Sequence, residues 1–304
     1  MEGLKDRENV DPQVDGIEAF RAATSQLQIE TSVNPVALET VHSFSIEGRE
    51  SSIPARFYAP FAKDEMTALP ILLFIHGGAW VIGDLDSYDS LCRYIAAKAE
   101  VICISVDYRL APEHPFPAAL NDCMDALHWI ARNAVDIGGS PDKICVAGDS
   151  AGGTLAAALC HIFSHDETVK IARQILMYPC LDPLDGVEYP SRKAFGGGGF
   201  FLEEAGLRFL CDLYIRDQKY HQDPRMWPGL SHDLRFQPNT LMILAELDLL
   251  RDEGLNYVSR LKAADVPVEC IVYDGTIHGF ICFAGVIDPG LLALGNIVDF
   301  MKKW

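Results

Sequence analysis

Basic residues are scarce in this sequence. Its 304 residues include 25 Lys and Arg against 43 Asp and Glu, which gives a formal net charge of −18. No Lys- or Arg-rich run is present, so the charge pattern that binds nucleic-acid phosphates or an anionic membrane is missing. We therefore expect no nucleic-acid partner, and we interpret the acidity as a well-solvated surface rather than as a sign of one substrate.

Long hydrophobic runs are absent as well. No run approaches the roughly 18 apolar residues that cross a bilayer, and the first 16 residues are charged, without the apolar core of a secretory signal. The nine cysteines form no C-x-x-C pair, and several lie in apolar runs such as 101–104 and 143–146. They are typical of buried thiols in a reducing compartment. We expect a cytoplasmic protein with no membrane span and no disulfide framework.

Motifs for metals and nucleotide cofactors are also missing. The histidines are scattered, no H-E-x-x-H occurs, and the acidic residues form no calcium-binding loop. No G-x-G-x-x-G follows a predicted strand, and the run Gly196–Gly199 is either a hinge or a plain loop. We predict a protein without a metal ion or a cofactor.

Apolar residues make up 49% of the chain, and many of them gather in short runs separated by helical patterns. Six nearly continuous runs are typical of strands buried on both faces of a parallel sheet: Ile71–Ile75, Val101–Val106, Ile144–Ala147, Gln174–Tyr178, Leu241–Ala245 and Val268–Tyr273. Helical patterns lie between them at Ser87–Lys98, Phe116–Asn133, Ala151–Phe163 and Asp252–Ala264. Two earlier segments, Thr40–Ile46 and Ile53–Tyr58, alternate as antiparallel strands do. This order predicts an α/β fold with a mostly parallel eight-stranded sheet and helices on both faces.

Two regions fall outside this alternation. Residues 1 to about 39 carry an amphipathic helical stripe of Val14, Ile17, Phe20, Leu27 and Ile29. Residues from about 183 to 237 separate two of the strands and contain a helical pattern at Leu202–Ile215. We expect one domain over residues 1–304, in which both regions form a helical cap over the active face.

The most informative segment is Gly148–Gly152, which reads G-D-S-A-G and follows the apolar run Ile144–Ala147. Glycines two residues before and after a serine suit a strained strand-to-helix turn that lifts the hydroxyl above a parallel sheet. The helical pattern that begins at Ala151 supplies the expected helix, whose free N–H groups favour a negative charge. We therefore predict that Ser150 is a nucleophile, although the pentapeptide taken alone also suits a plain glycine-rich turn.

A serine nucleophile needs a histidine base that is itself oriented by a carboxylate, and the order Ser, acid, His is usual on such sheets. Of the downstream histidines, His278 follows the last predicted strand, at the sheet edge where parallel strands place their chemistry. Asp248 follows the preceding strand and is preferred over Glu246, which falls near the strand, and Asp252, which suits a helix start. We predict Ser150, Asp248 and His278 as a catalytic triad.

The loop after the first parallel strand reads H-G-G-A-W from position 76. Glycines allow backbone N–H groups to approach a substrate oxygen closely, and an HGGG-type loop supplies such donors in lipases and esterases. We predict that the amides of Gly77, Gly78 and Ala151 form the oxyanion hole. His76 is expected to anchor the loop rather than to act as a second base.

Together these segments resemble the hormone-sensitive-lipase family of esterases within the α/β-hydrolase superfamily. The resemblance rests on a set of segments in the family's order: His76–Trp80, Asp107–Ala119, Gly148–Gly153, Asp248 with Arg251–Gly254, and His278–Phe280. As a set they span most of the chain from about residue 70 to 280, and they are far more specific than any one motif.

The resemblance implies a carboxylic-ester hydrolase that cleaves short to medium acyl esters of a small-molecule substrate through an acyl-enzyme, under a helical cap. We expect Ala79, Trp80 and Asp149 to line the substrate pocket, with Ala79 in place of the family's usual third glycine. Asp107 and Arg109 are expected to be buried and paired behind the site.

Two alternatives stay open. A non-catalytic small-molecule receptor on the same fold would have lost the catalytic histidine, whereas His278 is present here. An amidase or a lactonase would use the same triad, and the sequence does not separate it from an esterase. A homodimer through the last strand, Val268–Tyr273, or through the helix after it would fit the family.

Overall fold

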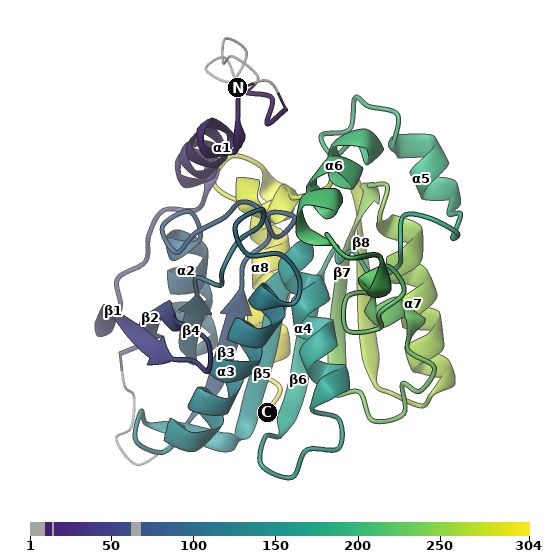
Figure 1. Ribbon diagram of the computed structural model, residues 1–304. Helices are drawn as coiled ribbons and strands as arrows, with labels where there is room; N and C mark the ends of the chain where they lie inside the picture. Colours follow the sequence, from purple (N-terminus) through teal and green to yellow (C-terminus); the bar gives the residue numbers. More distant parts are fainter. Residues whose placement is uncertain (1–9, 14, 62–67) are drawn as a thin grey trace.

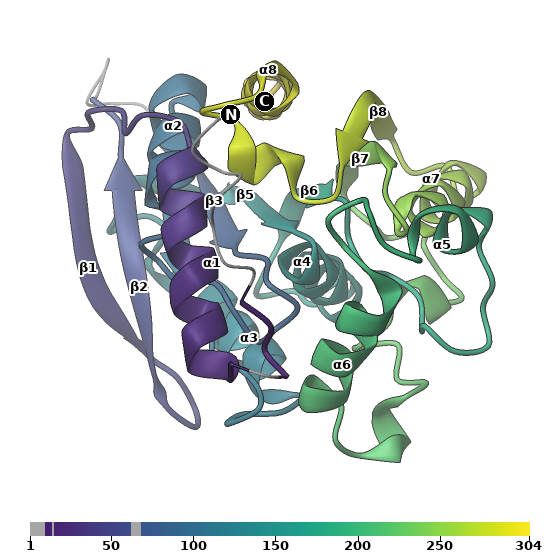
Figure 2. The ribbon, with the colours of Figure 1, turned by 90° about the horizontal axis from the view of Figure 1, so that it is seen from above.

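The computed structural model describes residues 10–13, 15–61 and 68–304 (Figure 1). The predicted stripe residue Val14 lies outside these ranges. Within them, eight strands form one mixed sheet, and helices cover both of its faces (Figures 1 and 2). This arrangement confirms the predicted α/β fold.

The sheet is antiparallel at one edge and parallel elsewhere. In spatial order its strands are β1 (Thr40–Glu47), β2 (Ser52–Ala59), β4 (Ile102–Val106), β3 (Leu69–Ile75), β5 (Gly139–Asp149), β6 (Ile171–Met177), β7 (Asn239–Leu247) and β8 (Val268–Ile277). β2 pairs antiparallel with β1 and β4, and the other pairs are parallel. β4 is buried along its whole length because helices cover both faces there, whereas β1 keeps an exposed face.

Five helices pack against the sheet: α2 (Asp89–Ala99), α3 (Ala118–Asn133), α4 (Ala151–Ile162), α7 (Arg251–Ala263) and α8 (Asp288–Met301). α2 and α8 share one apolar layer with Leu72 and Phe74 of β3. α3, α4 and α7 share the other layer with Leu73 and Ile75. Successive side chains of a strand point to opposite faces, so β3 contributes to both layers. Figure 2 shows the two groups of helices on opposite sides of the sheet.

Three further helices are not among those that cover the faces of the sheet: α1 (Ile17–Thr31), α5 (Pro190–Phe195) and α6 (Glu204–Tyr214). Figure 1 places them at the same end of the molecule, at the top of the view. Arg21 of α1 donates to the Val81 carbonyl at 2.8 Å, and Tyr214 of α6 accepts the Phe116 N–H at 2.8 Å. Both regions predicted as a cap therefore contact the loops at that end.

The described ranges also contain three short 3-10 helices: η2 (Gln218–Tyr220), η3 (Pro228–Leu230) and η4 (Phe280–Phe283). η2 and η3 lie in the segment between α6 and β7, and η4 follows β8 after His278 and Gly279. None of the helices in the described ranges is both long enough and apolar enough to cross a membrane.

Candidate active site

Ser150 lies on a strained turn between β5 and α4. Its backbone φ is +50°, in the left-handed region that a residue with a side chain rarely adopts. The turn can form because the residues two positions before and after Ser150 are glycines, which have no side chain. A Cβ on Gly148 would lie 2.3 Å from the backbone of Gly152, and one on Gly152 would lie 2.0 Å from the Ile75 carbonyl oxygen. The Ser150 N–H also donates to the Met177 carbonyl at 2.8 Å, which fixes the turn to β6.

A continuous chain of hydrogen bonds joins three of the predicted site residues. Nε2 of His278 lies 2.9 Å from Oγ of Ser150, and Nδ1 lies 2.7 Å from Oδ2 of Asp248. The other oxygen of Asp248 accepts the Leu250 N–H at 2.9 Å. Asp248 and His278 are only 1% and 5% exposed, so water competes little for these bonds. With Nδ1–H donated to the carboxylate, Nε2 is left to accept the serine proton.

The three residues meet because their strands end at the same edge of the sheet. β5, β7 and β8 run parallel, and each of them ends at the residue before its site residue. The other candidate acids have different partners. Glu246 accepts the Gly275 N–H at 2.7 Å, and Asp252 accepts the Ser191 N–H at 2.8 Å. Neither carboxylate is hydrogen-bonded to the histidine.

The backbone amides of the glycine loop after β3 differ in whether they already have a hydrogen-bond acceptor in the protein. The N–H of Gly77 donates to Oδ1 of Asp149 at 2.7 Å, so it is already engaged within the protein. No described residue accepts a backbone hydrogen bond from the amides of Gly78, Ala79 or Ala151. Of the three predicted donors, Gly78 and Ala151 therefore have a free amide and Gly77 does not. The amide of Ala79, which was not predicted as a donor, is free as well.

Asp149 lies behind this loop. One of its carboxylate oxygens accepts the Gly77 N–H, and the other accepts the hydroxyl of Tyr88 at 2.9 Å. Burial raises the pKa of Asp149 to about 6, against the opposing effect of these hydrogen bonds. Asp149 therefore supports the glycine loop from the interior instead of lining an open pocket. Tyr88 is a part of the site that sequence reasoning missed, because no motif marks a tyrosine at the start of α2.

Trp80 is also placed differently from the expected pocket wall. It is fully buried, and its ring stacks on that of Tyr214 in α6, with centroids 4.9 Å apart and planes at 6°. Trp227 meets it edge-on at 6.4 Å. Trp80 therefore joins the glycine loop to the cap region. Ala79 is half-buried, and its φ of +49° is a conformation that glycine adopts more easily. Its own amide is one of the free ones, so Ala79 remains part of the site.

His76 anchors the loop from the interior. It is fully buried, it stacks on Tyr108 with centroids 4.2 Å apart, and its Nδ1 lies 2.8 Å from the Gly77 carbonyl oxygen. Burial lowers the pKa of His76 to about 4, so the ring is neutral at pH 7. The predicted structural role of His76 is confirmed.

The pairing expected for Asp107 and Arg109 needs correction. Arg109 donates to Asp122 of α3 at 2.8 Å and to Glu50 at 3.0 Å. Asp107 is half-buried, and its Oδ1 lies 3.9 Å from Nε2 of the neutral His76. The two residues are therefore not paired with each other, and both partners of Arg109 lie outside the segment Asp107–Ala119 that carries the resemblance.

The described ranges hold no group of three or more His, Cys, Asp or Glu that could bind a metal ion. All nine cysteines are free thiols, and seven of them are buried. The functional groups gathered at Ser150 are thus a hydroxyl, an imidazole, a carboxylate and free backbone amides. Such a set suits nucleophilic attack on a carbonyl carbon with stabilisation of the resulting oxyanion.

Known proteins resemble this chain in sequence and in overall fold. The family with the alpha/beta hydrolase fold matches residues 72–282. Over 289 residues the chain is 37% identical to esterase LipI of Mycobacterium tuberculosis, which covers 92% of this chain and 88% of the relative. It is 33% identical over 267 residues to ethyl acetate hydrolase of Pseudomonas putida, which covers 87% of this chain and 83% of the relative.

Solved structures of esterases have a similar fold. The hyperthermophilic esterase from the archaeon Pyrobaculum calidifontis has a TM-score of 0.87 at 34% identity, covering 94% of this chain and 93% of that one. An ester hydrolase from the metagenome of Lake Arreo has a TM-score of 0.90 at 33% identity, covering 99% and 94% of the two chains. The predicted resemblance is confirmed. The chain belongs to the α/β-hydrolase family, within its hormone-sensitive-lipase group of esterases, and is a carboxylic-ester hydrolase.

Proposed function

We propose that this carboxylesterase works through a triad of Ser150, His278 and Asp248 and through an acyl-enzyme intermediate. The observation that carries the proposal is the pair of hydrogen bonds, 2.9 Å and 2.7 Å long, by which His278 joins the other two residues. Nucleophile, base and orienting carboxylate are each within the hydrogen-bond reach that this catalysis needs. In this role Asp248 holds the imidazole in one tautomer and stabilises the imidazolium that forms.

The first half-reaction forms the acyl-enzyme. Oγ of Ser150 bonds to the ester carbonyl carbon while its proton passes to Nε2 of His278. The tetrahedral intermediate then loses its bond to the alcohol oxygen, and the alcohol leaves with the proton from Nε2. In the second half-reaction His278 takes a proton from water, whose oxygen attacks the acyl carbon. The bond to Ser150 then breaks, the serine regains its proton and the carboxylic acid is released.

We propose the amides of Gly78, Ala79 and Ala151 as the donors that hold the oxyanion. Their lack of a backbone acceptor among the described residues supports this choice. Ala151 begins α4, and the N-terminus of a helix favours a developing negative charge. Ala79 replaces Gly77 in this proposal because the Gly77 N–H is donated to Asp149.

The substrate is proposed to lie beneath a cap formed by the described part of residues 1–39 and by residues 183–237, within the single domain predicted for residues 1–304. The position of α1, α5 and α6 at one end of the molecule supports this arrangement (Figure 1). We propose a preference for short to medium acyl chains, because the methyl group of Ala79, where the family usually has a glycine, would narrow the site beside the free amides. A series of p-nitrophenyl esters from acetate to laurate tests this preference, and a kcat/KM that rises up to laurate would contradict it.

The proposed setting is the cytoplasm, where the nine free thiols would stay reduced. A homodimer through β8 or α8 is also proposed. β8 is an edge strand of the sheet, and such a strand offers unpaired N–H and C=O groups to a second copy. Sedimentation equilibrium tests the dimer, and a purely monomeric protein across the micromolar range would contradict it.

Hydrolysis of p-nitrophenyl acetate and butyrate by the wild type and by Ser150→Ala tests the nucleophile. Loss of the nucleophile costs about 10⁶ in kcat in triad enzymes, so the variant should fall to background. A circular-dichroism spectrum and a melting temperature like those of the wild type show that the variant is folded. Unchanged turnover would exclude Ser150 as the nucleophile.

Two further measurements separate the alternatives. A fluorophosphonate probe reacts with an activated serine, so it should label the wild type and not Ser150→Ala. A receptor with an inactive triad would remain unlabelled. Matched ester, amide and lactone substrates distinguish an esterase from an amidase or a lactonase, and we expect the ester to be hydrolysed fastest.

A further inference from the structure

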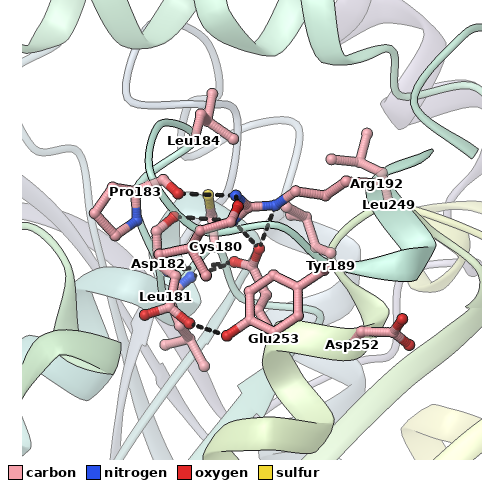
Figure 3. Close-up of polar contacts among 12 residues, drawn as sticks. Cys180, Leu181, Asp182, Pro183, Leu184, Tyr189, Arg192, Leu249, Asp252 and Glu253 are labelled. Atoms are coloured by element: carbon pink, nitrogen blue, oxygen red, sulfur yellow. Dashed lines mark hydrogen bonds and ion pairs between the residues drawn. The ribbon is translucent and has the colours of Figure 1, made fainter.

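An ion pair is buried between the cap region and α7. Arg192 of α5 is 5% exposed, and Glu253 of α7 is fully buried. Nε and Nη2 of Arg192 both donate to Oε2 of Glu253, a contact that fixes both side chains (Figure 3). Glu253 follows Asp248 closely in the chain, yet neither member of the pair belongs to the proposed triad.

The guanidinium also organises the segment that follows β6. It donates to the backbone carbonyls of Asp182, Pro183 and Val187 at 3.1, 2.8 and 3.0 Å, and the first two of these contacts are drawn in Figure 3. Oε1 of Glu253 accepts the Leu181 N–H at 2.7 Å. A planar fork of five N–H donors can satisfy so many acceptors in one geometry, whereas a lysine ammonium cannot. The pair therefore fixes the start of the cap region against one point of α7.

The residue before Arg192 extends this contact to the loop of the proposed catalytic acid. Oγ of Ser191 donates to the Leu249 carbonyl at 2.9 Å, and the Ser191 N–H donates to Oδ2 of Asp252 at 2.8 Å. Leu249 is the residue after Asp248. The start of α5 thus holds the loop both directly after the acid and at the first turn of α7.

We propose that Ser191 and Arg192 are positioning residues for Asp248. They fix residues 248–253, so that the carboxylate stays at hydrogen-bond distance from Nδ1 of His278. This inference rests on the proposed function, because it acts through the triad. A misplacement of about 1 Å costs up to roughly 10²-fold in rate, so a precisely held acid loop has a catalytic use.

Stability alone does not require this arrangement. A well-packed apolar pair of similar volume often stabilises a protein as well as a buried ion pair does. An apolar pair would not define where the carbonyls of Asp182, Pro183 and Val187 lie, because it makes no directional bonds. The Arg192 fork does so, and it connects the cap region to the acid loop in one geometry.

A double-mutant cycle with Arg192→Lys, Asp248→Asn and the double variant tests the inference, with kcat and KM measured on p-nitrophenyl butyrate. Arg192→Lys keeps the charge but loses the fork, so kcat should fall about 10-fold while KM changes by less than about twofold. In the Asp248→Asn background the same change should lower kcat by less than about twofold, because the group that it positions is gone. An equal loss in both backgrounds, or no loss in the first, overturns the inference.

Two more variants separate positioning from stability. Arg109→Lys weakens the ion pair with Asp122, which lies on α3 rather than on the acid loop, so it should lower the melting temperature and leave kcat unchanged. Ser191→Ala removes one hydroxyl and keeps the inference testable if Arg192→Lys does not fold. It should lower kcat at least about threefold, and a wild-type kcat would overturn the inference. If Asp248→Asn alone leaves kcat unchanged, the proposed triad fails, which is a separate outcome.

Discussion

The amide N–H of Gly77 donates to the carboxylate of Asp149 at 2.7 Å. This bond joins the glycine loop after β3 to the turn that carries Ser150. The hydroxyl of Tyr88, the residue before α2, donates to the other carboxylate oxygen at 2.9 Å and completes the contact. The proposed nucleophile and the proposed oxyanion donors are therefore parts of one hydrogen-bonded unit, which the protein supports from its interior before any substrate binds.

Removal of the Asp149 carboxylate should lower kcat strongly and change KM less. We expect Asp149→Ala to lower kcat by about 10²-fold with a smaller change in KM, because one displaced oxyanion donor costs about 10²–10³ in kcat. Asp149→Asn is the matched control, since it keeps an acceptor for the Gly77 N–H and should lose much less. Steady-state kinetics on p-nitrophenyl acetate measure both. A wild-type kcat for Asp149→Ala would mean that the loop keeps its geometry without the carboxylate.

The same carboxyl should make stability depend on pH. Burial raises the pKa of Asp149 from 3.8 to about 6, so the folded protein keeps a proton that the unfolded chain releases. Its contribution to stability is therefore full below the unfolded pKa and is lost as the pH rises through the folded pKa. Two pKa units correspond to about 3 kcal/mol.

We therefore expect the free energy of unfolding of the wild type, relative to Asp149→Asn, to fall by about 3 kcal/mol between pH 3.5 and 7. Urea unfolding of both proteins at a series of pH values measures this difference. The comparison with Asp149→Asn cancels the titration of the other buried groups. A difference that does not change with pH would contradict the raised pKa.

The turn at Ser150 should not accept a side chain at Gly152. A Cβ there would lie 2.0 Å from the Ile75 carbonyl oxygen, and backbone cannot move aside cheaply. We expect Gly152→Ala to lose at least about 3 kcal/mol of stability or to fail to fold. Gly295→Ala in α8 is the matched control, because nothing lies within 4 Å of its Cβ. It should gain about 0.5–1 kcal/mol by thermal unfolding. Equal stability of the two variants would refute the steric argument.

The contact between Trp80 and Tyr214 is expected to depend on the ring and not on the hydroxyl. The Tyr214 hydroxyl is buried and has no hydrogen-bond partner among the described residues, which costs about 1–3 kcal/mol. Tyr214→Phe should therefore be neutral or stabilising in thermal unfolding. Tyr214→Ala should cost about 3–5 kcal/mol because it leaves a cavity against Trp80. A loss as large for Tyr214→Phe would reveal a partner for the hydroxyl, such as a bound water.

Most of the sheet was predictable because buried parallel strands are apolar at every position. Prediction was weaker at the strand ends. β8 continues past its predicted end at Tyr273 to Ile277, because residues near its end are partly exposed and interrupt the apolar run. The two short segments 40–46 and 53–58 were recognisable by their alternation, and they form the antiparallel pair of β1 and β2.

By itself the sequence determined the sheet, the strained turn and the order of the proposed triad, because each depends on residues adjacent in the chain or on the ends of strands. Only the tertiary structure decided which polar groups meet: Gly77 with Asp149, Arg109 with Asp122, and Arg192 with Glu253. These partners are 72, 13 and 61 residues apart in the chain. A buried polar group forms hydrogen bonds with the partner that tertiary packing places next to it, so no local sequence pattern predicts that partner.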